Sequence, residues 1–113
     1  MKKGCGIHRF RAFCLILIYY RMNFSELGLS PEILSAITDM GYTEPTPIQE
    51  RAIPVILCEG QDLVALAQTG TGKTAAFGLP IIGQINYETR SIQALMLAPT
   101  RELCVQIAKD LER

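Results

Sequence analysis

The spacing of apolar and polar positions predicts four helices in the part of the chain after residue 30. The first begins at Ser30-Pro31, where a capping hydroxyl precedes proline, and it ends at Gly41. Three further helical patterns begin after Thr46, near Lys73 and after Thr100. The expected apolar faces are Ile33, Leu34, Ile37 and Met40 in the first helix, Ile48, Ala52, Val55 and Ile56 in the second, and Leu103, Ile107 and Leu111 in the fourth.

Two prolines fall inside these helical patterns. Proline has no backbone N–H, and its ring clashes with the preceding turn of a helix. We therefore expect Pro54 to kink or shorten the second helix and Pro80 to interrupt the third.

Two short, largely apolar runs, residues 63–67 and 93–98, alternate with the helices. Such runs are typical of strands that are buried on both faces of a parallel sheet. The order strand, helix, strand, helix is that of an α/β fold, a parallel sheet with helices on both faces. Because two strands do not make a stable sheet of this kind, we expect residues 22–113 to be the front part of an incomplete domain.

Composition indicates a globular chain, and charge adds little to the picture. Of the 113 residues, 49% are apolar and 19% are charged. The formal net charge is zero, but residues 1–21 carry five basic residues and no acidic one, which leaves residues 22–113 with a net charge of −5. The chain has no excess of positive charge, so its charge gives no argument for a nucleic-acid partner.

The four cysteines, at positions 5, 14, 58 and 104, lie too far apart for metal-finger or C-x-x-C spacing, and His8 is the one histidine. Neither a zinc site nor a disulfide framework is expected. We interpret the cysteines as buried thiols in a reducing compartment, which predicts a cytoplasmic location.

The first 21 residues differ from the rest and are interpreted as an extension outside the native fold. A basic start precedes an apolar run over residues 12–20, which is too short to cross a bilayer. Three interpretations stand: a signal or anchor segment, a native basic extension, and upstream sequence translated from a misplaced start. We favour the third, because Met22 opens a sequence typical of a protein start, and we expect no membrane association.

Residues 67–74, AQTGTGKT, follow the first predicted strand and match a phosphate-binding loop except at the first position, where G-x-x-x-x-G-K-[ST] has glycine. Gly70 and Gly72 stand where the backbone must turn tightly and approach a phosphate. Lys73 would bring its charge to the β and γ phosphates, and Thr74 would offer a hydroxyl to Mg²⁺. Ala67 lies at the strand end, where a methyl group is tolerable. We therefore predict a nucleotide site rather than an incidental glycine-rich turn.

Three motifs, taken in order, resemble those of the DEAD-box RNA helicases, and of bacterial members in particular. They are GYTEPTPIQ at 41–49, AQTGTGKT at 67–74 and PTREL at 99–103. The family commonly has alanine at the first position of its phosphate loop. The resemblance covers residues 22–113, and it rests on the first two motifs because PTREL alone is weak. It implies the N-terminal portion of a RecA-like P-loop NTPase domain, with ATP, Mg²⁺ and RNA as ligands.

The resemblance also implies roles for individual residues. Gln49 would read adenine, since a carboxamide matches the donor at N6 and the acceptor at N7 of that base. Lys73 and Thr74 would serve catalysis, and Thr74 would also hold the metal. The implied nucleotide contacts are Phe24, Tyr42, Pro47, Gln49, Gln68, Thr69, Gly70, Thr71, Gly72, Lys73 and Thr74, and the implied RNA contacts are Pro99, Thr100 and Arg101.

Several of these residues have an alternative structural role. Thr46-x-x-Gln49 is a capping box, in which Gln49 only bonds back to the Thr46 backbone. Phe24 and Tyr42 suit ordinary packing in the core or at its rim. Thr100 suits a helix cap, followed by a solvated Arg101.

The acidic D-E-A-D motif, the S-A-T motif and a second RecA-like domain with its arginine finger do not occur in the sequence. Phosphoryl transfer depends on such groups converging on the γ-phosphate, so we expect ATP and RNA binding as part of a helicase but no activity of this chain alone. No obligate protein partner can be inferred. The alternatives are another P-loop ATPase, which GYTEPTPIQ disfavours, and a truncated nucleotide-binding or interaction module without turnover.

Overall fold

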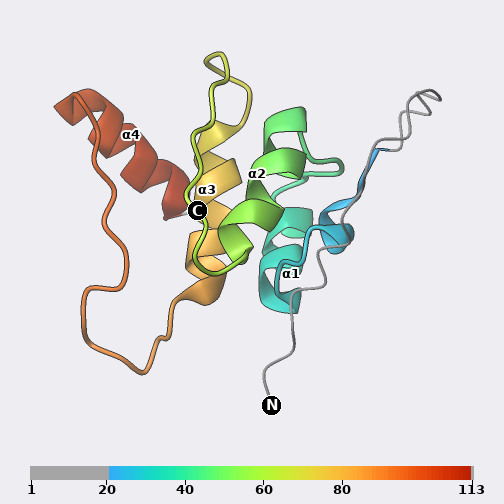
Figure 1. The fold of residues 1–113 in the computed structure, drawn as a ribbon, viewed down its shortest axis with the longest axis horizontal. Coiled ribbons are helices and arrows are strands. Elements are labelled where there is room, and N and C mark those ends of the chain that lie inside the picture. Colours follow the sequence, from blue (N-terminus) through green and yellow to red (C-terminus); the bar gives the residue numbers. More distant parts are fainter. Residues whose placement is uncertain (1–20, 113) are drawn as a thin grey trace.

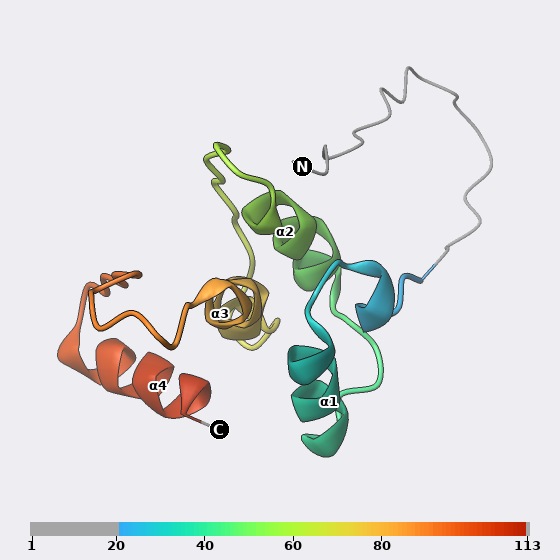
Figure 2. The same cartoon turned by 90° about the horizontal axis from the view of Figure 1, so that it is seen from below.

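The computed structural model describes residues 21–112, so all of the predicted extension except Arg21 lies outside the described residues. The regular elements are η1 (Phe24–Glu26), α1 (Pro31–Asp39), α2 (Pro47–Leu57), α3 (Lys73–Gln84) and α4 (Arg101–Leu111). Helix α3 is central, because it contacts α1, α2 and α4. Figures 1 and 2 show α4 on one side of α3 and the pair α1 and α2 on the other.

Helix α1 begins and ends where the sequence predicts. The Ser30 hydroxyl accepts a hydrogen bond from the backbone N–H of Ile33 at 3.5 Å. At the other end Gly41 has a φ of 78° and closes the helix with a Schellman motif, in which two successive N–H groups bond to carbonyls of the last turn. Hydrogen bonds from the backbone and from Ser30 lower the pKa of Glu32 in the first turn.

Neither internal proline ends its helix. Helix α2 continues past Pro54 to Leu57, and α3 continues past Pro80 to Gln84. The prediction that Pro80 interrupts the third helix is therefore wrong, and Pro54 does not shorten α2. Pro80 is one of the most deeply buried residues, less than 2% exposed, so its packing offsets the lost hydrogen bond.

The buried core lies among η1 and its flanking residues, α1 and α2, and Leu79 of α3 packs against it. Its members are Phe24, Leu27, Leu29, Ile37 and Ile53. Ile53 is fully buried although it was not among the predicted apolar residues of the second helix. Met40 was predicted to face the core but is 42% exposed, because α1 ends there and the chain turns away.

Helix α4 packs on α3 more loosely than α2 does. It has no buried residue, and Leu103 of its predicted apolar stripe is 37% exposed. A Cβ added at Gly78 of α3 would meet Leu111 Cδ2, so the two helices approach closely at this glycine. Within the described residues, no helix is long and apolar enough to cross a bilayer.

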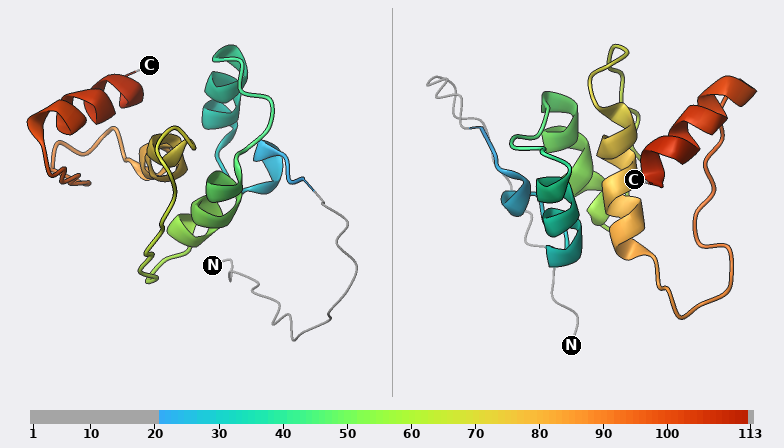
Figure 3. Two further views of the ribbon diagram at one scale, coloured as in Figure 1. Left: turned by 90° about the horizontal axis from the view of Figure 1, so that it is seen from above. Right: turned by 180° about the vertical axis from the view of Figure 1, so that it is seen from behind.

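The two predicted strands are not formed: the described residues contain helices and turns but no strand. Segments 63–67 and 93–98 instead expose large apolar side chains, and Val64, Leu66, Leu95 and Leu97 are 90%, 92%, 78% and 86% exposed. Figure 3 shows the segments as separate connections, one leading into α3 and the other into α4. A strand requires hydrogen bonds to a neighbour, and these segments do not pair with each other. The expected parallel sheet is therefore absent from the part of the chain that the structure describes.

Candidate functional site

The phosphate-loop sequence leads directly into the N-terminus of α3. Gly70 and Gly72 have φ values of 77° and 83°, in the left-handed region that favours glycine. Gly72 is the N-cap residue of α3, and no side chain caps this helix. The first N–H groups of α3 and the positive end of its dipole thus form a place suited to an anion.

Lys73 closes this loop onto its own backbone. Its ammonium group donates a hydrogen bond to the carbonyl oxygen of Ala67 at 2.6 Å, across the whole loop. Thr71 adds a second closure, because its hydroxyl donates to the carbonyl of Gln68 at 2.7 Å. The contact involves only the backbone carbonyl of residue 67, so it is compatible with alanine at the first position of the loop. A lysine is a flexible point charge, and it can exchange this carbonyl for a phosphate oxygen.

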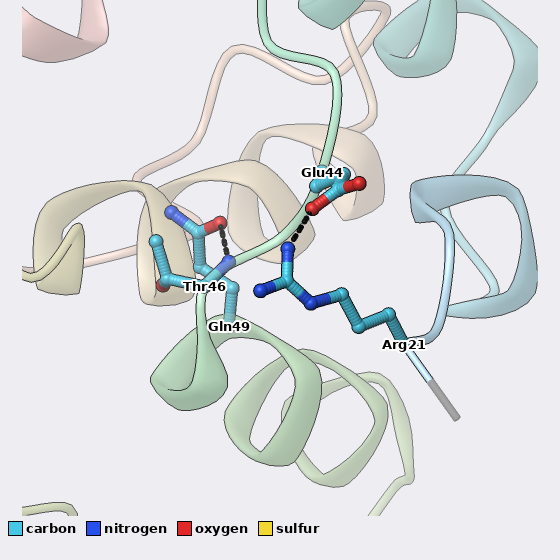
Figure 4. Close-up of polar contacts among 4 residues, drawn as sticks. All are labelled: Arg21, Glu44, Thr46 and Gln49. Atoms are coloured by element: carbon cyan, nitrogen blue, oxygen red, sulfur yellow. Dashed lines mark hydrogen bonds and ion pairs between the residues drawn. The ribbon is translucent and has the colours of Figure 1, made fainter. Parts of the chain in front are cut away.

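Gln49 links the start of α2 to the phosphate loop and is only 3% exposed. Its Oε1 accepts a hydrogen bond from the backbone N–H of Thr46 at 3.0 Å, as Figure 4 shows. Its Nε2 donates to the carbonyl oxygen of Gly72 at 3.2 Å. The first bond is the backbone half of the predicted capping box. The Thr46 hydroxyl takes the other position of the capping box, toward the backbone N–H of Gln49, but Thr46 Oγ1 is buried and makes no hydrogen bond of normal geometry.

Gly72 fits between these side chains because it has no Cβ. A Cβ built at this position would lie 2.5 Å from Gln49 Nε2 and 3.3 Å from Thr46 Oγ1. Thr46, Gln49 and the phosphate loop therefore form one packed cluster. In this conformation both ends of the Gln49 amide are engaged, so reading a base requires the amide to exchange one of its two backbone partners.

The two aromatic residues predicted near the base lie in different environments. Phe24 is 6% exposed and packs in the apolar core, which is the structural role considered for it as an alternative. Tyr42 is 48% exposed in the loop that leads to α2, where its ring offers a free surface. Pro47 is the first residue of α2, as the sequence predicts, and is also exposed.

The residues present suit the phosphates better than they suit a metal on its own. Thr74 is half-buried in the first turn of α3, where its hydroxyl is the ligand that the sequence predicts for Mg²⁺. Among the described residues, no group of three or more His, Cys, Asp or Glu side chains could hold a metal ion. A magnesium ion at Thr74 would depend on phosphate oxygens for its other ligands.

The third motif forms the start of α4. The Thr100 hydroxyl accepts a hydrogen bond from the backbone N–H of Leu103 at 3.3 Å, so the capping role considered for Thr100 is confirmed. Arg101 is the first residue of the helix, and both Arg101 and Pro99 are exposed. An exposed guanidinium at a helix N-terminus suits phosphate groups. The cap is made by the Thr100 hydroxyl and does not involve the Arg101 guanidinium.

Sequence reasoning missed a contact between the predicted extension and the first motif. Arg21 Nη1 forms a hydrogen-bonded ion pair with Glu44 Oε2, in the loop before α2 (Figure 4). The two residues are 23 positions apart, and no local pattern indicates such a pair.

Comparisons with known proteins relate the chain to one family. The model of the DEAD/DEAH box helicase family matches residues 46–113. ATP-dependent RNA helicase CshA of Limosilactobacillus reuteri is 58% identical over 92 residues, and DeaD of Klebsiella pneumoniae is 52% identical over 92 residues. Both alignments cover 81% of this chain but only 18% and 14% of those proteins. The chain therefore spans less than a fifth of the length of these curated relatives.

Solved structures show the same relationship. A DEAD box protein from Methanococcus jannaschii superposes with a TM-score of 0.75 at 48% identity, over 80% of this chain and 25% of that one. Dbp5 of Saccharomyces cerevisiae, in a structure with RNA and ADP BeF3, has a TM-score of 0.75 at 45% identity, over 80% of this chain and 23% of that one.

Proposed function

Because this chain belongs to the DEAD/DEAH box helicase family and matches the N-terminal part of the RecA-like domain, we propose that it is the ATP-binding portion of an ATP-dependent RNA helicase. Its membership of the family agrees with the prediction made from its three motifs. The observation that carries the proposal is the cluster in which Gln49 contacts Gly72 of the phosphate loop. This cluster brings an amide that can read a base next to a helix N-terminus that can hold phosphates.

In the proposed binding mode, the triphosphate lies at the start of α3. Lys73 leaves the carbonyl of Ala67 and places its charge on the β and γ phosphates. The backbone N–H groups of the first turn of α3 donate to phosphate oxygens. Thr74 offers its hydroxyl to Mg²⁺, which when bound would neutralise phosphate charge. Gln49 exchanges a backbone partner for the edge of adenine, and Tyr42 supplies a flat surface beside it.

RNA contact is proposed at the start of α4. Thr100 shapes the helix N-terminus through its cap, and Arg101 presents a guanidinium that suits the sugar-phosphate backbone. The structure of Dbp5 with RNA and ADP BeF3 supports RNA binding by likeness, since that relative was solved with RNA.

A second candidate function is nucleotide binding without turnover. It is favoured because the acidic motif and the arginine finger of the family do not occur in these 113 residues. Phosphate release from the purified chain, with and without RNA, tests whether this chain turns over ATP, with Lys73→Ala as the blank. We expect no RNA-dependent release. Release above the blank would contradict an inert chain and would show that other acids, such as Asp62 or Glu102, serve the metal.

A further inference from the structure

Arg21 lies outside the three helicase motifs, yet its side chain reaches the first of them. Its guanidinium pairs with the carboxylate of Glu44, two residues before Thr46 at the start of α2. Both side chains remain accessible, at 68% exposed for Arg21 and 53% for Glu44. Ion pairs this exposed contribute little to folding, so stability does not account for the position of the guanidinium.

Arg21 also lines a pocket at the start of α2. Arg21, Pro45, Pro47 and Glu50 line a pocket of about 210 Å³. Two proline side chains provide apolar surface, and Arg21 and Glu50 provide a donor and an acceptor at its edge. Figure 4 shows the Arg21 side chain extending toward the turn that holds Thr46 and Gln49. Pro45 and Pro47 of the lining flank Thr46, whose backbone N–H donates to Gln49 Oε1, so the pocket lies at the turn where base reading is assigned above.

The chemistry of this pocket suits the nucleoside part of a nucleotide. A guanidinium can lie on the face of a planar base, and its N–H groups can donate to ring nitrogens or to ribose hydroxyls. Glu44 holds the guanidinium through one nitrogen, Nη1, which leaves other N–H groups of the fork for a ligand. The triphosphate has its own site at the start of α3, so the two ends of the nucleotide would be held separately.

We propose that Arg21 is a specificity-determining contact for the nucleoside moiety, and that Glu44 positions it. This inference rests on the proposed function, because it places the base at the first motif. It assigns a ligand contact to a residue that sequence reasoning had placed in an extension outside the fold. It also predicts that loss of Arg21 affects ligands that carry a base and leaves bare polyphosphate unaffected.

The test compares binding of ATP and of inorganic tripolyphosphate to the full chain and to Arg21→Ala. We expect Arg21→Ala to weaken ATP binding about two- to five-fold, the range of an exposed cation–π contact, and to leave tripolyphosphate binding unchanged. Arg21→Lys should restore ATP affinity only in part, because it lacks the planar fork. Arg90→Ala, which removes an exposed arginine from the loop between α3 and α4, is the matched control and should bind both ligands as the unmodified chain does.

Unchanged ATP affinity in Arg21→Ala, or an equal loss for ATP and tripolyphosphate, would overturn the assignment. Weaker ATP binding that is fully explained by partial unfolding of Arg21→Ala, measured as a lowered urea midpoint, would also overturn it. If the unmodified chain binds tripolyphosphate but not ATP, the base site itself is wrong and the assignment fails with it. If it binds neither ligand, the proposed function fails, which is a separate result.

Discussion

The side-chain amide of Gln49 donates a hydrogen bond to the backbone carbonyl of Gly72, 23 residues further along the chain, at 3.2 Å. The same side chain accepts a hydrogen bond from the backbone of Thr46. One buried carboxamide thus holds the start of α2 against the start of α3. The first motif and the phosphate loop, which are separate in the sequence, form a single structural unit here.

Removal of the Gln49 amide should affect both stability and base choice. We expect Gln49→Ala to lower the free energy of unfolding by about 1–3 kcal/mol, because two backbone groups lose their buried partner. If Gln49 reads adenine, the variant should also lose its preference for ATP over GTP. Urea unfolding and competition binding measure the two effects, with Gln106→Ala, at an exposed site on α4, as the control. An equal loss of affinity for both nucleotides would support a purely structural cap.

Gly72 should tolerate alanine less well than other glycines of similar backbone conformation. A Cβ at Gly72 would lie 2.5 Å from Gln49 Nε2, whereas a Cβ at Gly60, where φ is 78°, would meet nothing within 4 Å. Gly60→Ala should cost about 1–2 kcal/mol from its left-handed backbone alone. Gly72→Ala should cost more and should weaken nucleotide binding. Equal unfolding free energies for the two variants would contradict the close packing described for this cluster.

Two glycines within α3 should respond differently to alanine. Gly83→Ala should stabilise the chain by up to about 0.5–1 kcal/mol, since its Cβ would make an ordinary contact with Ile33 at 3.5 Å. Gly78→Ala should show no such gain, because its Cβ would meet Leu111 Cδ2 and displace α4 or its side chain. Urea unfolding of both variants measures the difference. A similar gain at Gly78 would show that α4 does not pack closely there.

The acid dependence of stability should include a contribution from Glu32. Backbone and Ser30 hydrogen bonds hold its pKa below the ordinary value of about 4.5. A carboxylate with a lowered pKa stabilises the folded state above its unfolded pKa, and the effect is lost as the pH falls through the folded pKa. Glu32→Gln should therefore be less stable than the unmodified chain at pH 6, and the two should converge at lower pH. A constant difference between their unfolding midpoints across this range would argue against the shift.

Much of the local structure was predictable because its causes are local. Ser30 and Thr100 cap their helices with hydroxyls, and Gly41 closes α1, as the sequence indicates. Pro80 was misjudged because the cost of a missing N–H was weighed without packing, and Pro80 is almost completely buried. Position-by-position patterns cannot show this compensation.

The strand prediction failed for a different reason. An apolar run such as residues 63–67 identifies a segment that suits a buried strand, but a strand also needs a hydrogen-bonded neighbour. No such neighbour contacts it among the described residues, and Leu66 is 92% exposed. Likewise, Gln49 contacts Gly72, and Arg21 contacts Glu44, across long stretches of sequence. Only the three-dimensional structure shows these pairs.

Equilibrium titration of ATP tests the central claim, that this chain holds a nucleotide at the start of α3, most directly. The titration compares the unmodified chain, Lys73→Ala and Lys109→Ala, which removes an exposed lysine from α4. Lys73 supplies the charge for the β and γ phosphates, so its loss should weaken saturable ATP binding at least about ten-fold, the equivalent of 1.4 kcal/mol. Lys109→Ala should bind ATP like the unmodified chain. Equal ATP affinity in all three proteins would contradict the nucleotide site.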